Sequence, residues 1–246
     1  MADKKKKKKQ VVDQTKDLML NANPKSMFSE SIKNIRTNLQ FSAVDKELKI
    51  ILNTSPEAGD GKSFISANLA LAYGQEGKKV LLIDCDLRRG RQHEIFNVVN
   101  TTNGGYSNLI LNFKEDIKLS RYIVKTDVKH VDLIPTGPTP PNPLELLSSK
   151  NNQELLEELK YYYDIIILDC PPVVGMSDTP VLSKLSDANL MVISSGKTHM
   201  ESLEKAKKAF ESANSKINGI VINKANIKGS AYNSYYTSEY YTSRDE

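Results

Sequence analysis

The chain has 246 residues, of which 39% are hydrophobic and 26% are charged, and it carries a formal net charge of +4 at pH 7. One α/β domain of this length is ordinary, so length alone does not require two domains. Two cysteines, Cys85 and Cys170, lie far apart within apolar runs, which excludes a disulfide framework and fits a reducing cytosol.

The positive charge is concentrated at the N-terminus. Residues 1–9 contain six lysines and one aspartate, or +5, which leaves −1 for the remainder of the chain. This segment is interpreted as a solubilising tail, with attraction to the anionic inner leaflet of a membrane as the alternative. Nucleic acid is not an expected partner, because no aromatic residues alternate with the lysines to stack on bases. A cytoplasmic location is expected, since neither a signal peptide nor an apolar run of membrane-spanning length is present.

Residues 1–24 are expected to form a flexible basic arm. The segment after Pro24, "SMFSESIKNIRTNLQFSA", repeats apolar residues at helical spacing and predicts a helix with Ser26 or Ser29 as its N-cap. The polar residues 228–246 are expected to form a flexible, tyrosine-rich tail. The folded domain is therefore expected to comprise residues 25–227.

From Lys49 onward, short apolar runs alternate with helical segments, which predicts a doubly wound, mostly parallel α/β sheet with a binding site beyond the carboxyl ends of its strands. Most of the runs are continuous in Val, Ile and Leu, as is typical of strands buried on both faces. The predicted strands are KIILNTS, KKVLLIDCD, VDLIPTG, YDIIILDCP, ANLMVISSG and INGIVINK, and the predicted helices include Phe64–Gln75, Asn151–Tyr161 and Met200–Ala213.

The stretch "SPEAGDGKS", Ser55–Ser63, follows the first predicted strand and precedes a predicted helix. It matches the P-loop pattern G-x-x-x-x-G-K-[ST] except that Pro56 replaces the first glycine, which indicates a deviant Walker A motif. Backbone N–H groups of such a loop face phosphate oxygens, the lysine neutralises the β- and γ-phosphates, and the serine ligates Mg²⁺. The alternative is a glycine turn beside an unrelated lysine. The predicted nucleotide-binding residues are Gly59, Asp60, Gly61, Lys62, Ser63 and Phe64.

Two further predicted strands end in acidic residues. Asp84 and Asp86 are spaced i, i+2, which puts both carboxylates on one side of an extended chain, and Asp169 ends a strand as a Walker B aspartate does. Such aspartates often cap turns, but three of them after a P-loop favour a single site. The predicted Mg²⁺ ligands are Ser63, Asp86 and Asp169, and the predicted catalytic residues are Lys62, Asp84 and Asp86.

With these motifs in place, the chain from about Phe28 onward resembles the bacterial tyrosine kinases of capsule and exopolysaccharide synthesis, the CpsD/CapB-type BY-kinases. The resemblance covers Ser55–Ser63, Leu81–Asp86, Ile165–Asp169 and Thr136–Ser149 as Walker A, A′ and B motifs and a further family stretch. It implies a MinD/ParA-related P-loop fold and an autokinase that uses ATP and Mg²⁺.

The resemblance also assigns roles at both ends of the domain. A C-terminal tyrosine cluster is the family's autophosphorylation target, inserted into the adjacent subunit's site. An early helical E-x-x-R-x-x-R motif packs between subunits of a ring, although Lys33 replaces its first arginine here. Gly90 stands where the family usually has proline, which is expected to loosen that segment. The implied phosphoacceptors are Tyr232, Tyr235, Tyr236, Tyr240 and Tyr241, and the implied interface residues are Glu30, Lys33 and Arg36.

A phenol acceptor benefits from a carboxylate base, for which Asp84 is favoured over Asp86, with the choice left open. The family also implies a transmembrane adaptor, a polysaccharide co-polymerase whose cytoplasmic segment activates the kinase at the inner face of the membrane, and an opposing tyrosine phosphatase. Two other interpretations remain: a partitioning ATPase of the ParA/MinD type, and a nucleotide-binding scaffold without catalytic activity. The ParA/MinD type usually has a signature lysine early in the P-loop, which "TSPEAG" lacks.

Overall fold

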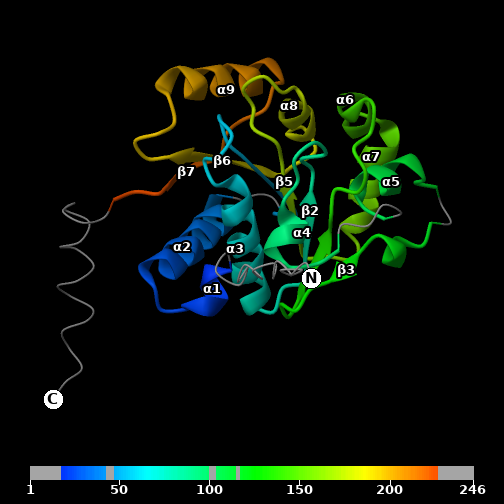
Figure 1. Ribbon diagram of the computed structural model, residues 1–246, viewed down its shortest axis with the longest axis horizontal. Helices are drawn as coiled ribbons and strands as arrows, with labels where there is room; N and C mark the ends of the chain where they lie inside the picture. The colour runs from blue at the N-terminus through cyan, green and yellow to red at the C-terminus, as the bar shows by residue number, and fades with distance from the viewer. Residues whose placement is uncertain (1–17, 43–46, 100–103, 115–116, 227–246) are drawn as a thin grey trace, which may run out of the picture.

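The computed structural model describes residues 18–42, 47–99, 104–114 and 117–226. Within them a seven-stranded sheet has the order β3-β4-β2-β5-β1-β6-β7, and all neighbouring strands are parallel except β3 and β4. Figure 1 labels β7, β6, β5, β2 and β3, which follow one another in that order across the sheet. The doubly wound, mostly parallel fold predicted from the sequence is confirmed. The strands are β1 Ile50–Thr54, β2 Val80–Asp84, β3 Val124–Lys125, β4 Val131–Ile134, β5 Ile165–Asp169, β6 Ala188–Ser194 and β7 Gly219–Asn223.

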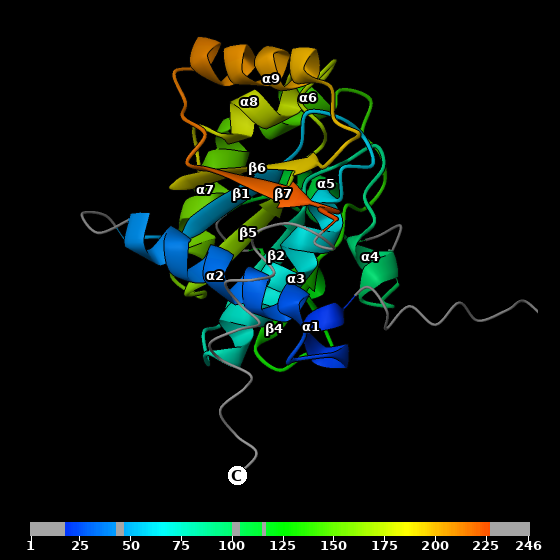
Figure 2. The same cartoon turned by 90° about the vertical axis from the view of Figure 1, so that its left-hand side faces the viewer.

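Helices cover both faces of the sheet. Figure 2 shows α1, α2 and α3 on one side and α8 and α9 on the other. Each side has its own buried apolar cluster, the first built on α2 and α3 and the second on α5 to α9. The helices are α1 Met19–Ala22, α2 Met27–Ser42, α3 Lys62–Gln75, α4 Gln92–Ile95, α5 Tyr106–Leu111, the 3₁₀ turn η2 Leu119–Arg121, α6 Pro143–Leu147, α7 Lys150–Leu159, α8 Asp178–Leu182 and α9 Met200–Ser212.

The central strands β1, β2 and β5 are buried at every position, which explains their continuous aliphatic sequences. The antiparallel edge strand β3 was not predicted, because two residues are too short for a periodic pattern to be recognised. The predicted N-cap is present at α2, where Ser26 Oγ accepts a hydrogen bond of 3.1 Å from the backbone N–H of Ser29.

The folded body begins earlier than the sequence predicted. Residues 18–24 were assigned to the flexible arm, but Met19–Ala22 form α1 and Leu20 is completely buried. The backbone N–H of Leu20 donates to Oδ1 of Asn68 on α3 at 3.0 Å. This helix therefore belongs to the core beside α2 and α3, while residues 1–17 lie outside the described part of the chain.

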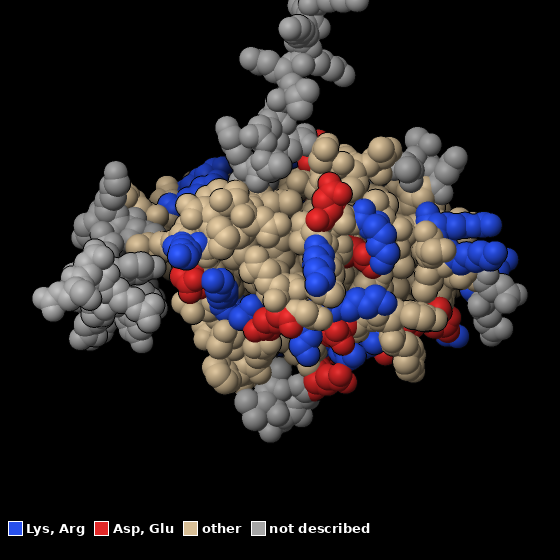
Figure 3. Space-filling view, turned by 90° about the horizontal axis from the view of Figure 1, so that it is seen from below, with Lys and Arg blue, Asp and Glu red and all other residues tan. Residues whose placement is uncertain are grey.

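The surface mixes charges of both signs. Figure 3 shows one face of the molecule, on which basic and acidic side chains are interspersed. This agrees with a charge of −1 for the chain without residues 1–9. In the described ranges no helix has both the length and the apolar character needed to cross a bilayer.

Candidate active site

The phosphate loop joins the end of β1 to the start of α3. Gly59 and Gly61 have φ angles of +85° and +101°, a region that residues with a Cβ rarely adopt. A Cβ at position 61 would also lie 2.1 Å from Nδ2 of Asn223 at the end of β7. The glycines therefore permit both the turn itself and the close approach of the end of β7 to the loop.

Residues from the β6–β7 side hold this loop in place. Lys224 Nζ donates to the backbone oxygen of Gly59 at 2.8 Å. The buried carboxylate of Asp60 accepts hydrogen bonds from Thr198 Oγ1 at 2.9 Å and from the backbone N–H of Glu57 at 3.0 Å. Asp60 was predicted as a nucleotide-binding residue, and its side chain is used here to hold the loop.

Lys62, Ser63 and Phe64 form the first turn of α3. Lys62 Nζ lies 3.2 Å from Ser63 Oγ, so the predicted phosphate and metal ligands are in contact. The Phe64 ring packs against Phe28 of α2, with ring centroids 5.0 Å apart. The side chain of Phe64 therefore belongs to the packing between α2 and α3, and we expect only its backbone to serve a nucleotide.

The three predicted aspartates meet at the carboxyl edge of the sheet. Asp84 and Asp169 are directly opposite each other in the register of β2 and β5, and Asp86 follows two residues later. Asp84 and Asp169 have no exposed surface and Asp86 is 5% exposed. Lys62 Nζ lies 3.2 Å from Asp86 Oδ2 and 3.9 Å from Asp169 Oδ1. The lysine of the loop and the strand-end acids thus form one cluster.

The clustering changes the proton affinity of these groups. Burial raises the pKa of Asp84 to about 8, and the nearby negative charge of Asp169 adds to the rise. Burial acts to lower the pKa of Lys62, but the negative charges of the three aspartates outweigh it and hold that pKa above its ordinary value. The lysine is therefore a cation and counterbalances the acids.

The residues of this cluster fit a hydrated Mg²⁺. The Lys62 ammonium already lies beside Asp86 and Asp169, so the position between them accommodates a cation. In the described part of the chain no three His, Cys, Asp or Glu side chains are placed to enclose a metal ion. Mg²⁺ usually keeps several waters and takes only one or two carboxylates together with phosphate oxygens, so this sparse ligand set suits it.

Sequence patterns missed several buried polar residues that support the aspartates. Ser66 Oγ donates to Asp169 Oδ1 at 3.0 Å, and Asn53 Nδ2 donates to Ser66 Oγ at 2.7 Å. Gln92 Nε2 donates to Asp169 Oδ2 at 2.8 Å. Ser66 lies one turn after Ser63 on α3, but Gln92 has no comparable sequence signal, because only the fold brings it to this edge.

The segment after Asp86 is tightly packed. A Cβ at Gly90 would lie 2.1 Å from Thr136 Cγ2 and 2.6 Å from Asp84 Oδ2. The expectation that glycine loosens this segment is therefore wrong, because its lack of a side chain lets the backbone pass directly over Asp84. Arg88 pairs with the buried Asp178 through Nη1, which fixes the segment on the other side.

The predicted interface residues behave differently from one another. Lys33 and Glu30 form an ion pair of 2.7 Å on the outer side of α2, where they are partly exposed. Arg36 instead contacts its own chain, donating from Nη1 to the backbone oxygen of Ala72 at 2.8 Å and pairing with Glu76 at 2.6 Å. The guanidinium therefore links α2 to α3 and is largely used within the subunit.

The predicted phosphoacceptors lie outside the described residues, which end at Asn226. The described chain leading to them passes the phosphate loop, because Lys224 contacts Gly59 immediately after β7. The predicted phosphoacceptors are Tyr232, Tyr235, Tyr236, Tyr240 and Tyr241.

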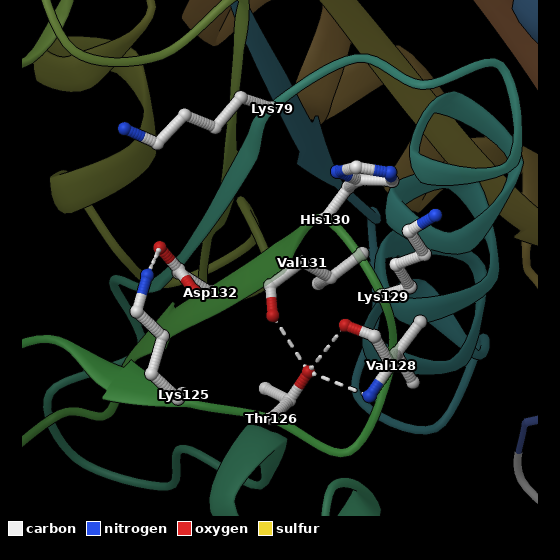
Figure 4. Close-up of a pocket in the computed structure, with 8 residues that line it drawn as sticks. All are labelled: Lys79, Lys125, Thr126, Val128, Lys129, His130, Val131 and Asp132. Atoms are coloured by element: carbon white, nitrogen blue, oxygen red, sulfur yellow. Dashed lines mark hydrogen bonds and ion pairs between the residues drawn. The ribbon is translucent and has the colours of Figure 1, made fainter.

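A pocket of about 360 Å³ lies at the other end of the sheet, beside the amino ends of β2 and β4. Figure 4 shows Lys79 and Lys129 on either side of His130, while Lys125 points to Asp132. The Lys125–Asp132 ion pair measures 2.6 Å. The pocket includes none of the predicted site residues. Its lining is Lys79, Lys125, Thr126, Val128, Lys129, His130, Val131 and Asp132.

Comparisons with known proteins agree with this geometry. The AAA domain family matches residues 48–222. The chain is 41% identical over 217 residues to the tyrosine-protein kinase YwqD of Bacillus subtilis, covering 88% of this chain and 90% of that protein. The kinase domain of the Escherichia coli tyrosine kinase ETK matches with a TM-score of 0.77 and 31% identity, covering 85% of this chain and 82% of that one. The septum site-determining protein MinD of Pyrococcus horikoshii, at 24% identity and a TM-score of 0.55 over 71% of this chain and 68% of its own, shares the fold alone.

Proposed function

This chain belongs to the bacterial tyrosine kinase family and is a protein-tyrosine kinase, and on that premise we propose that it uses ATP and Mg²⁺ to phosphorylate the C-terminal tyrosines of another copy of itself. The observation that carries the proposal is the convergence of Lys62 with Asp84, Asp86 and Asp169 beside the phosphate loop. A kinase binds a nucleotide, and the phosphate loop with Lys62 has the chemistry to hold its phosphates, while the aspartates have the chemistry to hold the accompanying Mg²⁺.

The proposed reaction is a single phosphoryl transfer. The tyrosine oxygen forms a bond to the γ-phosphorus as the bond to the β–γ bridging oxygen breaks, ADP leaves, and the phenol proton passes to a carboxylate. We assign the proton to Asp84, because burial raises its pKa to about 8, above that of an ordinary aspartate. Lys62 neutralises the transferred phosphoryl group. Mg²⁺, held by Ser63, Asp86 and Asp169, would supply further charge neutralisation.

The proposal extends to assembly and regulation. We expect a ring-like homo-oligomer in which one subunit's tail enters its neighbour's site, with Glu30, Lys33 and Arg36 near the contact. We further propose that a membrane adaptor of the polysaccharide co-polymerase type activates the kinase through its cytoplasmic segment, at the inner face of the membrane. A tyrosine phosphatase would reverse the reaction. In this scheme the phosphorylation state regulates capsule or exopolysaccharide synthesis and export.

The deciding experiment separates transfer between copies from transfer within one. A heavy-isotope Lys62→Met chain with an intact tail is mixed with a light chain whose five tail tyrosines are phenylalanine, then given ATP, Mg²⁺ and the adaptor's cytoplasmic peptide. Phosphate mapped by mass spectrometry on heavy-chain tail tyrosines supports the proposal. The matched control is heavy Lys208→Met, which removes an exposed lysine of α9 and keeps activity.

A chain that has both an active site and its own tail tyrosines needs a separate test for transfer within one chain, because Tyr232 follows Lys224 by only eight residues. An extended chain of that length spans up to about 26 Å, enough to return to its own phosphate loop. A rate of tail phosphorylation per molecule that stays unchanged on dilution below the concentration at which the oligomer dissociates would indicate transfer within one chain. ATP consumption with all phosphate released to water would favour a partitioning ATPase, and no turnover would favour a scaffold.

A further inference from the structure

Gln92 is a completely buried polar residue at the first position of α4. Its backbone N–H donates to Asp84 Oδ2 at 2.9 Å. Its side-chain Nε2 donates to Asp169 Oδ2 at 2.8 Å and to the backbone oxygen of Ser63 at 3.0 Å. One residue thus contacts the ends of two central strands and the first turn of the helix after the phosphate loop.

The surroundings fix the orientation of this amide. A backbone carbonyl and a carboxylate only accept hydrogen bonds, so both N–H groups of Nε2 must face them. Turning the amide over would place Oε1 against two other oxygens. Gln92 Oε1 is itself buried and has no hydrogen-bond partner among the described residues. An unpaired buried acceptor is unfavourable, so the donor contacts of Nε2 are what hold this polar side chain here.

These contacts determine how Asp169 is presented. Its Oδ1 accepts a hydrogen bond from Ser66 Oγ of α3 at 3.0 Å, and its Oδ2 accepts one from Gln92 of α4, so each oxygen is held by a different helix. A carboxylate held in this way keeps one orientation relative to Lys62, whose Nζ lies 3.9 Å from Oδ1. Residues that orient metal-binding groups typically change metal affinity or activity by about 10–100-fold when they are replaced.

We propose that Gln92 is a positioning residue of the kinase site. It fixes the Asp169 carboxylate against the first turn of α3. The gain in nucleotide affinity that Mg²⁺ provides therefore depends on Gln92. The inference rests on the proposed function, in which Asp169 faces the hydrated metal. It also links the residues after Asp86 to the metal, because Gly90 is what allows the chain to bring Gln92 over Asp84.

The test compares nucleotide affinity with and without metal. Gln92→Met keeps a similar volume but removes both donors. A fluorescent ADP analogue is titrated into wild type and variant, once with Mg²⁺ and once with EDTA. We expect the gain in affinity from Mg²⁺ to fall about 10-fold or more in the variant, with the EDTA value unchanged. The half-saturating Mg²⁺ concentration for autophosphorylation should rise by a similar factor.

Two further variants make the result decisive. Gln153→Met changes an exposed glutamine of α7 and should match wild type in every measurement. Gln92→Asn keeps the amide but is one methylene too short to reach both acceptors, so it should show the same loss of Mg²⁺ gain if Gln92→Met does not fold.

An unchanged Mg²⁺ gain in a folded Gln92 variant would overturn the inference. Equal losses with Mg²⁺ and with EDTA, accompanied by a lower Tm, would also overturn it, because they indicate a purely structural role. These outcomes are separate from failure of the proposed function. If wild type bound Mg²⁺ and nucleotide but left every tyrosine unmodified, the kinase proposal would fail, while a lost Mg²⁺ gain in Gln92→Met would still support the positioning role.

Discussion

At the scale of single residues, the acids at the carboxyl edge differ from ordinary strand-end carboxylates because they are buried together. Asp84 and Asp169 are fully enclosed and lie on adjacent strands in register. Among the described residues, Lys62 is the one cation that lies within 4 Å of two of these acids, Asp86 and Asp169. An excess of buried negative charge is unfavourable until a ligand brings further cations, so the site is expected to trade stability for function.

The raised pKa of Asp84 makes the stability of the folded chain depend on pH. Its folded-state pKa is about 8, against about 3.9 for an unfolded chain. Between these values the folded state binds more protons than the unfolded state, so the free energy of unfolding falls as pH rises. Asp84→Asn removes this titration. Without nucleotide or Mg²⁺, we expect the Tm of the variant relative to wild type to increase from pH 5.5 to pH 8, while kinase activity is lost.

Differential scanning calorimetry at both pH values checks this expectation. The two pKa values correspond to a relative gain of about 3 kcal/mol between pH 5.5 and pH 8, and each 1 kcal/mol appears as a Tm change of about 2–4 °C for a chain of this size. Glu154→Gln, on the exposed side of α7, controls for the loss of one negative charge. A constant Tm difference between Asp84→Asn and wild type across the pH range would show that Asp84 does not carry the effect.

Gly90 permits a second prediction at the residue scale. Gly90→Ala would force a Cβ to within 2.6 Å of Asp84 Oδ2, so the backbone or the acid must shift. Overpacking of this kind typically costs about 1–3 kcal/mol. We expect a loss of that order in urea unfolding and at least about a 10-fold fall in kcat. The proline that the resembled family usually has here also carries a Cβ, so Gly90→Pro should be no better tolerated.

Gly219→Ala is the matched control for this substitution. Its Cβ would meet only the end of the flexible Leu190 side chain, at 3.0 Å, so a small rotation can relieve the contact. Normal stability and activity in Gly90→Ala would mean that Thr136 and Asp84 adapt easily, contrary to the close packing seen in the structure.

At the scale of helices and strands, α2 is attached to α3 by more than its apolar side. Arg36 is 14% exposed and donates to a backbone oxygen of α3 while pairing with Glu76. Lys33 and Glu30 form an i, i+3 pair that is partly exposed. Hydrogen bonds to charged groups contribute about 1.5–3 kcal/mol, whereas exposed helix pairs contribute about 0.3–0.5 kcal/mol.

The different contacts of Arg36 and Lys33 predict that Arg36 stabilises its own subunit, whereas Lys33 contributes little to that stability. We expect Arg36→Ala to lower the free energy of unfolding by about 1–3 kcal/mol and Lys33→Ala to leave it nearly unchanged. Urea unfolding measures the stabilities, and analytical ultracentrifugation of the same samples measures assembly. If Arg36→Ala abolished assembly at unchanged stability, its contacts with α3 would not be what the residue contributes.

The features that could be predicted from the sequence are those whose signals lie close together in the chain. The residues Gly61, Lys62, Asp84 and Asp169 were predictable because each is defined by its position relative to one strand or one helix. Gln92 was not, because its partners lie on β5 and α3 and are brought together only by tertiary structure. The same limit applies to helix faces.

The early helical motif assigned Arg36 to a subunit interface, but could not reveal that a carbonyl of α3 lies in front of it. Leu20 was assigned to the arm because four residues of helix are too few to give a periodic pattern. The strands buried on both faces were the easiest elements to predict, since short, continuous aliphatic runs bounded by turn residues are typical of such strands.

At the scale of the whole molecule, charge is divided between a basic N-terminal segment and a body near neutrality. Residues 1–9 carry +5 and the remaining residues −1. Each phosphotyrosine adds about −1.5 to −2 charges at neutral pH, so modification of five tail tyrosines adds roughly −8 to −10. This exceeds the formal net charge of +4 and reverses the sign of the whole chain. Assembly that depends on tail insertion should therefore respond strongly to phosphorylation.

We expect the fully phosphorylated protein to shift from oligomer towards monomer. A phosphorylated tail carries a large negative charge, while the site it would enter holds the buried acids Asp86 and Asp169, so insertion becomes repulsive. Analytical ultracentrifugation of unmodified and phosphorylated protein at equal concentration measures the shift. Because screening shortens the range of such repulsion, 1 M salt should partly restore assembly of the phosphorylated form. The five-phenylalanine tail variant, incubated identically with ATP, must remain assembled, and a phosphorylated sample that still sedimented as the oligomer would contradict the mechanism.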